Sequence, residues 1–243
     1  MSGGFANAVS NIGREALRIV LPSWCIACDR ELAWRERTAS CCADCWASLP
    51  KITTATCRSC ALPLPGDTHI CIECSADPLP LDWCEAWGEY GGALEKLLHA
   101  LKFSRQDFLD APLAALLEER MRARGDVAFD AIVPVPMLRA RERKRGYNQA
   151  ALLAFALAPR IGAPCEPSLL GRRKEGATQS TLPKRARAAN VRGAFRAMPA
   201  AKDRSILIVD DICTTGETLR ACAAALRKAG AAKVCAVTVA KAT

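Results

Sequence analysis

Two adjacent carboxylates, Asp210 and Asp211, separate an apolar run from a loop of small hydroxyl residues. The run from Ile206 to Val209 is short and rich in β-branched residues, which is typical of a buried strand in a parallel sheet. The loop that follows consists of Thr214, Thr215, Gly216, Glu217 and Thr218. Backbone N–H groups of such a loop, at the start of a helix, form a cradle for one phosphate. Carboxylates would repel that phosphate but bind hydroxyls or Mg²⁺ beside it, so the stretch predicts a sugar-phosphate site.

The elements around this stretch predict a β-α-β unit. After the loop, apolar residues recur at helical spacing from Leu219 to Ala229, and Gly230 follows as a candidate helix cap. Lys233 to Val239 then has the composition of a second buried strand. In such a unit the ligand binds at the carboxyl end of the first strand, where we expect Asp210 and Asp211 to stand.

The stretch resembles the motif that binds 5-phosphoribosyl-1-pyrophosphate (PRPP) in type I phosphoribosyltransferases, which has four apolar residues, two acids and then TTGxT. The resemblance implies that Asp210 and Asp211 are catalytic groups that bind the ribose 2′- and 3′-hydroxyls, and that residues 214–218 hold the 5′-phosphate. Cys213 departs from the motif, because an aliphatic residue is usual there. A pair of aspartates that only caps the helix is the alternative interpretation.

The cysteines are concentrated early in the chain, since nine of the 14 lie between residues 25 and 74. Eight of them form four CxxC pairs: Cys25 and Cys28, Cys42 and Cys45, Cys57 and Cys60, Cys71 and Cys74. One CxxC turn presents two thiolates to a cation, and two such turns complete a tetrahedral Zn²⁺ site. We therefore expect two consecutive ribbons that hold two structural Zn²⁺ ions, with a cross-braced pairing as the alternative. Cys41 lacks the CxxC spacing, and His69 is expected to be a loop residue.

Basic residues dominate the rest of the chain. The net charge is +9, and residues 1–84 contain 7 Lys or Arg against 9 Asp or Glu, so the surplus lies after residue 84. Three basic clusters occur there, at residues 139–145, 172–174 and 184–187. A solvated surface is the alternative for each cluster, and PRPP accounts for part of the charge, but room is left for a nucleic-acid backbone. Few aromatic residues interleave with these clusters in the sequence, so no stacking platform for single strands is predicted.

Further elements of the same fold are predicted upstream. Residues 131–133 have the composition of a strand that ends at Pro134, Val135 and Pro136, because proline blocks further pairing. Helices are predicted over residues 94–103, 113–121 and 150–158. Residues 171–190 lack apolar periodicity and predict a loop that closes over the site.

Four features together resemble the ComF family: the CxxC pairs, LKFSRQ (101–106), IVPVPMLRARERKRGYNQA (132–150) and TQSTLPKRARAANVRGAF (178–195). The resemblance implies an α/β fold with a type I phosphoribosyltransferase-like parallel sheet flanked by helices, over residues 85–243. A small double zinc-ribbon domain with four cysteines per site precedes it, over residues 23–80. Residues 1–22 predict an amphipathic helix.

The same resemblance implies roles for further residues. The backbone at Val135 and Pro136 would bind pyrophosphate, and Lys102 and Arg145 would contact PRPP. Asn148, Gln149, Gln179, Arg187 and Asn190 match polar positions of the family.

The function implied by the resemblance is transfer of phosphoribose from Mg²⁺-bound PRPP, with release of pyrophosphate, to an acceptor that the motifs do not disclose. The family is associated with natural competence, so single-stranded DNA and proteins of the DNA-uptake machinery are implied as partners. Two alternatives stay open: a nucleic-acid-handling protein with a regulatory PRPP site, and a purine or pyrimidine salvage phosphoribosyltransferase. The sequence has no long apolar run and no signal peptide, so we expect a cytoplasmic protein without a membrane span.

Overall fold

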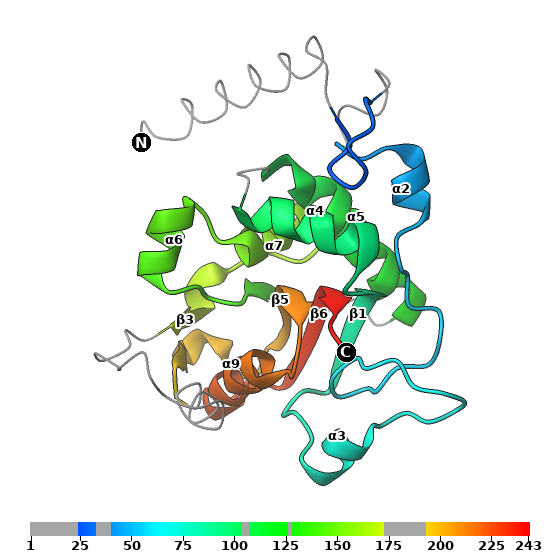
Figure 1. Ribbon diagram of the computed structural model, residues 1–243. Coiled ribbons are helices and arrows are strands. Elements are labelled where there is room, and N and C mark those ends of the chain that lie inside the picture. The colour runs from blue at the N-terminus through cyan, green and yellow to red at the C-terminus, as the bar shows by residue number, and fades with distance from the viewer. Residues whose placement is uncertain (1–23, 33–39, 104–106, 126–127, 173–192) are drawn as a thin grey trace, which may run out of the picture.

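A parallel sheet forms the centre of the structure, a computed structural model that describes residues 24–32, 40–103, 107–125, 128–172 and 193–243. Within these ranges, four strands form the sheet in the order β1-β6-β5-β2, and every pair is parallel. The strands are β1 (Trp83–Glu89), β2 (Ala131–Pro134), β5 (Ser205–Cys213) and β6 (Lys233–Lys241) (Figure 1). The predicted strands correspond to β2, β5 and β6, so the expected β-α-β unit is present.

Strand β5 is longer than predicted. It continues through both aspartates to Cys213, and Asp210 pairs with Thr238 while Cys213 pairs with Lys241. The predicted end of the strand at Val209 was too early, because β6 extends far enough to pair with the residues beyond it, but the acids lie at the carboxyl end of the strand as expected. Successive residues of a strand point to opposite faces of a sheet, so the two carboxylates belong to different sides of β5.

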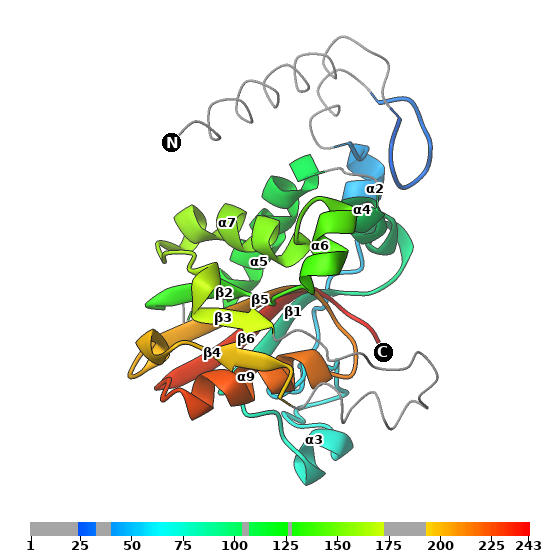
Figure 2. The same cartoon turned by 90° about the vertical axis from the view of Figure 1, so that its left-hand side faces the viewer.

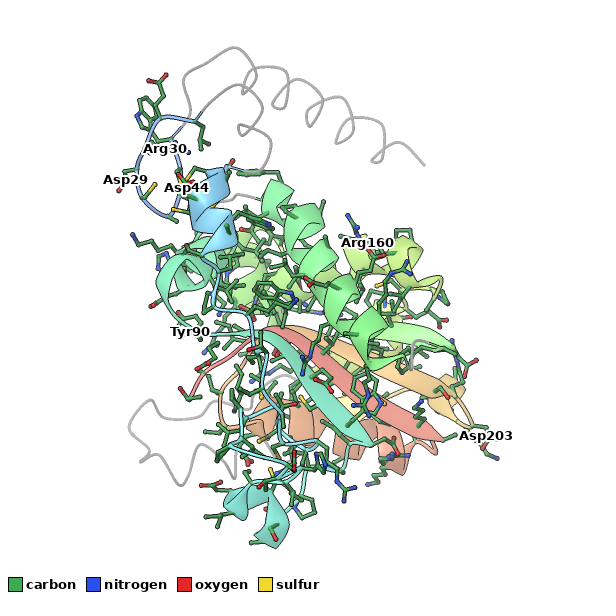
Figure 3. The ribbon with its side chains drawn as sticks, turned by 90° about the vertical axis from the view of Figure 1, so that its right-hand side faces the viewer. Asp29, Arg30, Asp44, Tyr90, Arg160 and Asp203 are labelled. Atoms are coloured by element: carbon green, nitrogen blue, oxygen red, sulfur yellow. The ribbon has the colours of Figure 1, made fainter. Side chains whose placement is uncertain are left out.

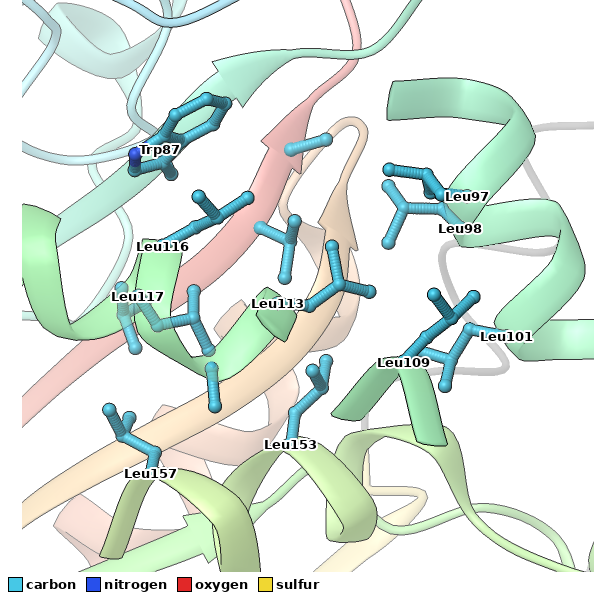
Figure 4. Packing of buried hydrophobic residues seen from close by; sticks show 14 of the residues in the cluster. Trp87, Leu97, Leu98, Leu101, Leu109, Leu113, Leu116, Leu117, Leu153 and Leu157 are labelled. Carbon is cyan, nitrogen blue, oxygen red and sulfur yellow. The ribbon is translucent and has the colours of Figure 1, made fainter. Parts of the chain in front are cut away.

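Helices cover both faces of the sheet (Figure 2). One face carries α4 (Gly92–Phe103), α5 (Asp110–Arg124) and α7 (Gln149–Ile161), which confirms the three predicted helices. Their leucines pack on Leu207 and Val209 of β5, and Figure 4 shows part of this cluster. The other face carries α9 (Glu217–Lys228), whose buried residues pack on Ile206 and Ile208. The alternation of these β5 side chains between the two clusters follows the two-residue period of a strand.

Shorter elements complete the described part of the chain. The strands β3 (Leu170–Arg172) and β4 (Phe195–Ala197) form an antiparallel pair beside α9. The basic stretch forms α6 (Arg139–Arg145), and the cysteine-rich part contains α2 (Ala43–Ala47) and α3 (Ile72–Ala76). Three 3₁₀ turns are η2 (Asp107–Leu109), η3 (Pro167–Leu169) and η4 (Pro199–Ala201).

The two ends of the sheet are distinct surfaces. Tyr90 follows β1 and Asp203 precedes β5, and Figure 3 shows them at opposite ends of the strands. The site predicted for PRPP belongs to the end near Tyr90, where β5 leads into α9. In the part of the chain that is described, no helix has the length and apolar character needed to cross a membrane.

Candidate functional site

The buried carboxylate of Asp211 is the centre of a polar network. Its Oδ2 lies 2.6 Å from Nζ of Lys102, at the end of α4, and its Oδ1 accepts a hydrogen bond of 3.4 Å from Nε2 of Gln149, at the start of α7. Arg145 donates in turn to Oε1 of Gln149. Four residues that the sequence singled out separately therefore form one connected network on the helical face that carries α4 and α7.

Asp210 lies in different surroundings, on the side of α9. Its Oδ1 accepts a hydrogen bond of 2.9 Å from the backbone N–H of Asp211. Desolvation, and then the neighbouring Asp211 carboxylate, raise the pKa of Asp210 well above its usual range. The backbone N–H bond and Lys102 act in the opposite direction but do not outweigh these causes. Asp210 is thus a carboxyl group that gains from a hydroxyl donor or a cation placed beside it.

The predicted phosphate cradle links β5 to α9. Thr214 and Thr215 are exposed, and Gly216 caps the helix with a left-handed backbone at φ +80°. Nζ of the buried Lys241, at the end of β6, donates to the carbonyl of Thr214. Glu217 and Thr218 begin α9. The loop is therefore held by Lys241 at its start and by α9 at its end, while the side chains of Thr214 and Thr215 face solvent.

A second loop approaches the same edge of the sheet from β2. The backbone N–H of Val135 donates to the carbonyl of Val209 over 2.9 Å, which extends the pairing of β2 with β5. The carbonyl of Val135 accepts a hydrogen bond of 3.0 Å from Nδ2 of Asn148, which also caps α7. Asn148 thus fixes the start of α7 relative to Val135 and Pro136, the residues proposed for pyrophosphate.

Cys213 is the departure from the family motif, and it occupies a polar environment. Its Sγ lies 3.9 Å from Nζ of Lys241. Hydrogen bonding with the Cys84 thiol lowers the pKa of Cys213 to about 7 despite the effect of burial, and Lys241 acts in the same direction. The thiol therefore lies beside the cation that holds Thr214, as well as inside the core.

The eight CxxC cysteines form two sets. Ligand atoms lie within 4.8 Å of one another in each set, the first with Cys25, Cys28, Cys42 and Cys45, the second with Cys57, Cys60, Cys71 and Cys74. Four thiols this close fit a tetrahedral structural Zn²⁺ ion, so the sequential pairing is confirmed in preference to the cross-braced one. Cys41 is outside the first set, and burial, followed by the charge of Cys25, raises the pKa of Cys41 to about 12.

Backbone N–H groups point at the sulfurs of these sets. Sγ of Cys25 accepts from the N–H of Cys42 at 3.3 Å and from that of Ala27 at 3.4 Å. Although burial raises the pKa of Cys25, these hydrogen bonds lower it to about 6. Burial also raises the pKa of Cys57, but hydrogen bonds from the backbone N–H groups of Cys71 and Cys60 lower it to about 7. One thiol in each set is thereby prepared for the thiolate form that Zn²⁺ requires.

The second set of cysteines lies against the predicted phosphate cradle, a contact that no sequence pattern indicated. A Cβ atom added at Gly216 would lie 3.0 Å from Cδ1 of Leu79, a residue packed with the second set of cysteines. The thiol of Cys213 lies 3.6 Å from the carbonyl oxygen of Cys60. Arg220 of α9 binds the carboxylate of Asp77 at 3.0 Å. The second ribbon therefore supports the loop and the helix that form the cradle.

Some predicted site residues fall outside the described ranges. Gln179, Arg187 and Asn190 belong to residues 173–192, as does most of the predicted closing loop, and the predicted helix over residues 1–22 is also outside. Three residues at the site, Lys241, Leu79 and Arg220, were not predicted from the sequence. Lys241 could have been suspected, because it lies just after a predicted strand. Leu79 and Arg220 could not, because their contacts with Gly216 and Asp77 join segments far apart in the chain.

The fold and these two sites define a phosphoribosyltransferase-like α/β protein with an N-terminal double zinc ribbon. The phosphoribosyl transferase domain family matches residues 148–243, and the double zinc ribbon domain family matches residues 16–75. The DNA utilization protein YhgH of Salmonella typhimurium is 35% identical over 182 residues, which is 73% of this chain and 80% of that protein. Competence protein F of Haemophilus influenzae is 31% identical over 73% of this chain and 81% of its own length. The chain belongs to the ComF family.

Among solved structures, one match is the glutamine PRPP amidotransferase of B. subtilis, complexed with ADP and GMP. It is 20% identical with a TM-score of 0.41, and the match covers 58% of this chain and 30% of that one.

Proposed function

We propose that this protein binds PRPP at the carboxyl end of β5 and transfers its phosphoribosyl group, with release of pyrophosphate, in the handling of single-stranded DNA. The observation that supports this is the placement of Asp210 and Asp211 directly before the cradle of residues 214–218. Asp210 and Asp211 hold the ribose hydroxyls, and the loop with its helix N-terminus holds the 5′-phosphate. Val135 and Pro136 present backbone groups to the pyrophosphate.

The proposed reaction is a displacement at ribose C1. The bond from C1 to the pyrophosphate oxygen breaks with its electron pair going to pyrophosphate, and the acceptor's lone pair forms the new bond. Lys102 and Arg145 stabilise the negative charge that develops on the leaving group. Asp210 and Asp211 offer hard oxygen donors that would hold a Mg²⁺ ion bound with PRPP, and this cation would supply positive charge against the charge that develops on pyrophosphate. Asp211 also keeps Lys102 in position, because their ion pair is largely buried.

A second candidate function is a nucleic-acid-handling protein in which PRPP only regulates binding. The observation that favours it is the basic helix α6, with exposed Arg139, Arg141, Arg143 and Lys144 beside the proposed PRPP site. A salvage phosphoribosyltransferase is the weaker alternative, since it gives no role to two zinc ribbons. The names of two relatives, a DNA utilization protein and a competence protein, support DNA as a partner. We further propose proteins of DNA uptake as partners and the cytoplasm as the location.

Isothermal titration with Mg²⁺ and PRPP tests the proposal. The wild-type protein should bind PRPP, and Asp210→Asn combined with Asp211→Asn should remove most of the affinity. Unchanged affinity in the double variant would rule out the hydroxyl-binding role. Pyrophosphate release with candidate acceptors then separates transfer from regulation, because a purely regulatory site binds PRPP without producing pyrophosphate.

A further inference from the structure

A basic cavity lies beside the proposed PRPP site, between the end of α4 and the helix α6. Its volume is about 340 Å³, and its lining consists of Lys102, Phe103, Arg141, Lys144, Arg145 and Tyr147. Four of the six side chains are cations and the other two are aromatic. Lys102 also binds Asp211 at 2.6 Å, so the cavity shares one residue with the network at the ribose end of the site.

Phe103 presents an apolar surface in this basic setting. The residue is 62% exposed, although the guanidinium of Arg145 lies 5.1 Å from the ring centroid and the His99 ring 4.6 Å away. Tyr147 is anchored through its hydroxyl, which donates to the carbonyl of Leu101. An exposed phenylalanine beside an arginine plane is the combination on which nucleic-acid bases stack.

The charges of the cavity suit a phosphodiester. Arg141 and Lys144 are exposed, and in the described part of the chain neither forms an ion pair with a carboxylate. Three further basic residues lie at positions 139, 143 and 145 of the same short helix. Pyrophosphate alone would use the cations but would gain nothing from Phe103, whereas a nucleotide uses both.

We infer that this cavity binds a nucleotide of a single-stranded nucleic acid, with the base stacked on Phe103 and the backbone phosphate held by Arg141 and Lys144. The inference rests on the proposed function. It adds the place at which a single-stranded nucleic acid would lie beside the PRPP site. No stacking platform was evident from the sequence because Phe103 and the basic residues of α6, which line one cavity, are 36 or more residues apart in the chain.

The test measures binding of fluorescent oligonucleotides by anisotropy. Phe103→Ala should weaken binding of oligothymidine about tenfold, the loss expected when one base loses its aromatic platform. Phe155→Ala is the matched control, because Phe155 is 55% exposed on α7 and lies outside the cavity lining. An abasic strand should bind Phe103→Ala and wild type equally, since it has no base to stack.

The phosphate contact is tested with Lys144→Gln across a salt series. The slope of log affinity against log salt should flatten by about 0.7 for the one lost contact with a single strand. Lys202→Gln, an exposed lysine at the opposite end of the sheet, should leave the slope unchanged. Oligouridine in parallel with oligothymidine shows whether RNA or DNA is the preferred strand.

The outcomes separate this inference from the proposed function. Both cavity variants should keep wild-type affinity for PRPP. Equal oligonucleotide affinity of Phe103→Ala and Phe155→Ala would overturn the inference, as would a wild-type protein that binds neither strand. A drop in PRPP affinity in both cavity variants would also overturn it, by assigning the cavity to pyrophosphate. Failure of wild-type protein to bind PRPP, with oligonucleotide binding intact, would instead remove the proposed function alone.

Discussion

Asp210 and Asp211 are neighbours in the chain but not equivalent in the site. Asp211 is buried and paired with Lys102 and Gln149, whereas Asp210 faces the side of α9 without a cation bound to it in the network described above. The raised pKa of Asp210 means that the folded protein holds its proton more tightly than the unfolded chain does. Stability from this group is present at acidic pH and is lost as the pH rises toward the folded-state pKa.

The variant Asp210→Asn should remove this pH dependence. Compared with wild type, it should gain free energy of unfolding as the pH rises from about 4 to about 7, because asparagine never acquires the desolvated charge. Urea denaturation at several pH values measures the difference, and Asp203→Asn, an exposed position at the other end of the sheet, is the control. A constant difference between Asp210→Asn and wild type over this range would contradict the prediction.

Gly216 is the residue at which the cradle meets the second ribbon. The variant Gly216→Ala should lose about 1–2 kcal/mol of unfolding free energy from its left-handed backbone, and further stability from the 3.0 Å approach to Leu79. PRPP affinity should fall as well, because the loop must shift. Gly162→Ala has a similar φ of +70° with open space around the added Cβ, so it should lose stability but keep PRPP affinity. Calorimetry and titration of both variants provide the comparison.

At the scale of elements, the two zinc ribbons have different neighbours. The first contributes Cys25, Ala27 and Leu32 to the cluster that includes the leucines of α4 and α5. The second contacts β5 and α9 through Leu79, Cys60 and Asp77. Closed four-cysteine sites usually stabilise folds. Among the residues that the structure describes, the contacts to the proposed phosphate cradle come from the second ribbon and not from the first.

Removing one zinc ligand from each ribbon should therefore have unequal effects. Cys74→Ser should lower both zinc content and PRPP affinity, since the ribbon that packs on Gly216 and Arg220 loosens. Cys28→Ser should lower zinc content by the same amount and leave PRPP affinity close to wild type. Metal analysis and titration on the two variants measure this, and an equal loss of PRPP affinity in both would show that the ribbons act only through overall stability.

Several elements could be predicted from the sequence, and others could not. The strands β2, β5 and β6 follow from short β-branched runs, and α4, α5 and α7 from apolar periodicity. The strand β1 was missed because its sequence, WCEAWGE, contains no β-branched residue. Its buried Glu85 forms ion pairs with Arg120 and Arg124, which join segments far apart in the chain. The helix α6 was missed because Ala140 is the single apolar residue of RARERKR, and one residue cannot show a period.

For the site, the spacing of residues within short stretches of sequence indicated function, but the contacts between distant segments could not be predicted. The CxxC pairs and the acids before TTGET indicated their chemistry because each lies within a few residues. The ion pair of Lys102 with Asp211 and the meeting of Phe103 with α6 join residues brought together by the sheet. No spacing rule encodes such contacts, since they depend on the order β1-β6-β5-β2 and on which helix covers which face.

At the scale of the whole molecule, Lys102 connects the proposed PRPP site with the inferred nucleotide cavity. Two anionic ligands that draw on the same ammonium group compete for its charge, so each should weaken the other. Such coupling is reciprocal: PRPP must change the affinity for a strand by the same factor by which the strand changes the affinity for PRPP. A factor of about 5 is expected, at the lower end of typical coupling between sites.

This coupling is measurable in both directions on one preparation. Oligothymidine affinity with and without saturating PRPP, and PRPP affinity with and without saturating oligothymidine, should give the same factor, which should shrink at high salt because the charges are screened. Lys102→Met should bring the factor close to one while each ligand still binds, although more weakly. The control Lys96→Met removes another α4 lysine, whose ammonium donates to the carbonyl of Ala27 in the first ribbon, and should leave the factor unchanged. The contrary result is that the two ligands exclude each other completely in wild type and still do so in Lys102→Met. That result would mean that they occupy one site, because competition for the Lys102 charge ends once that charge is removed.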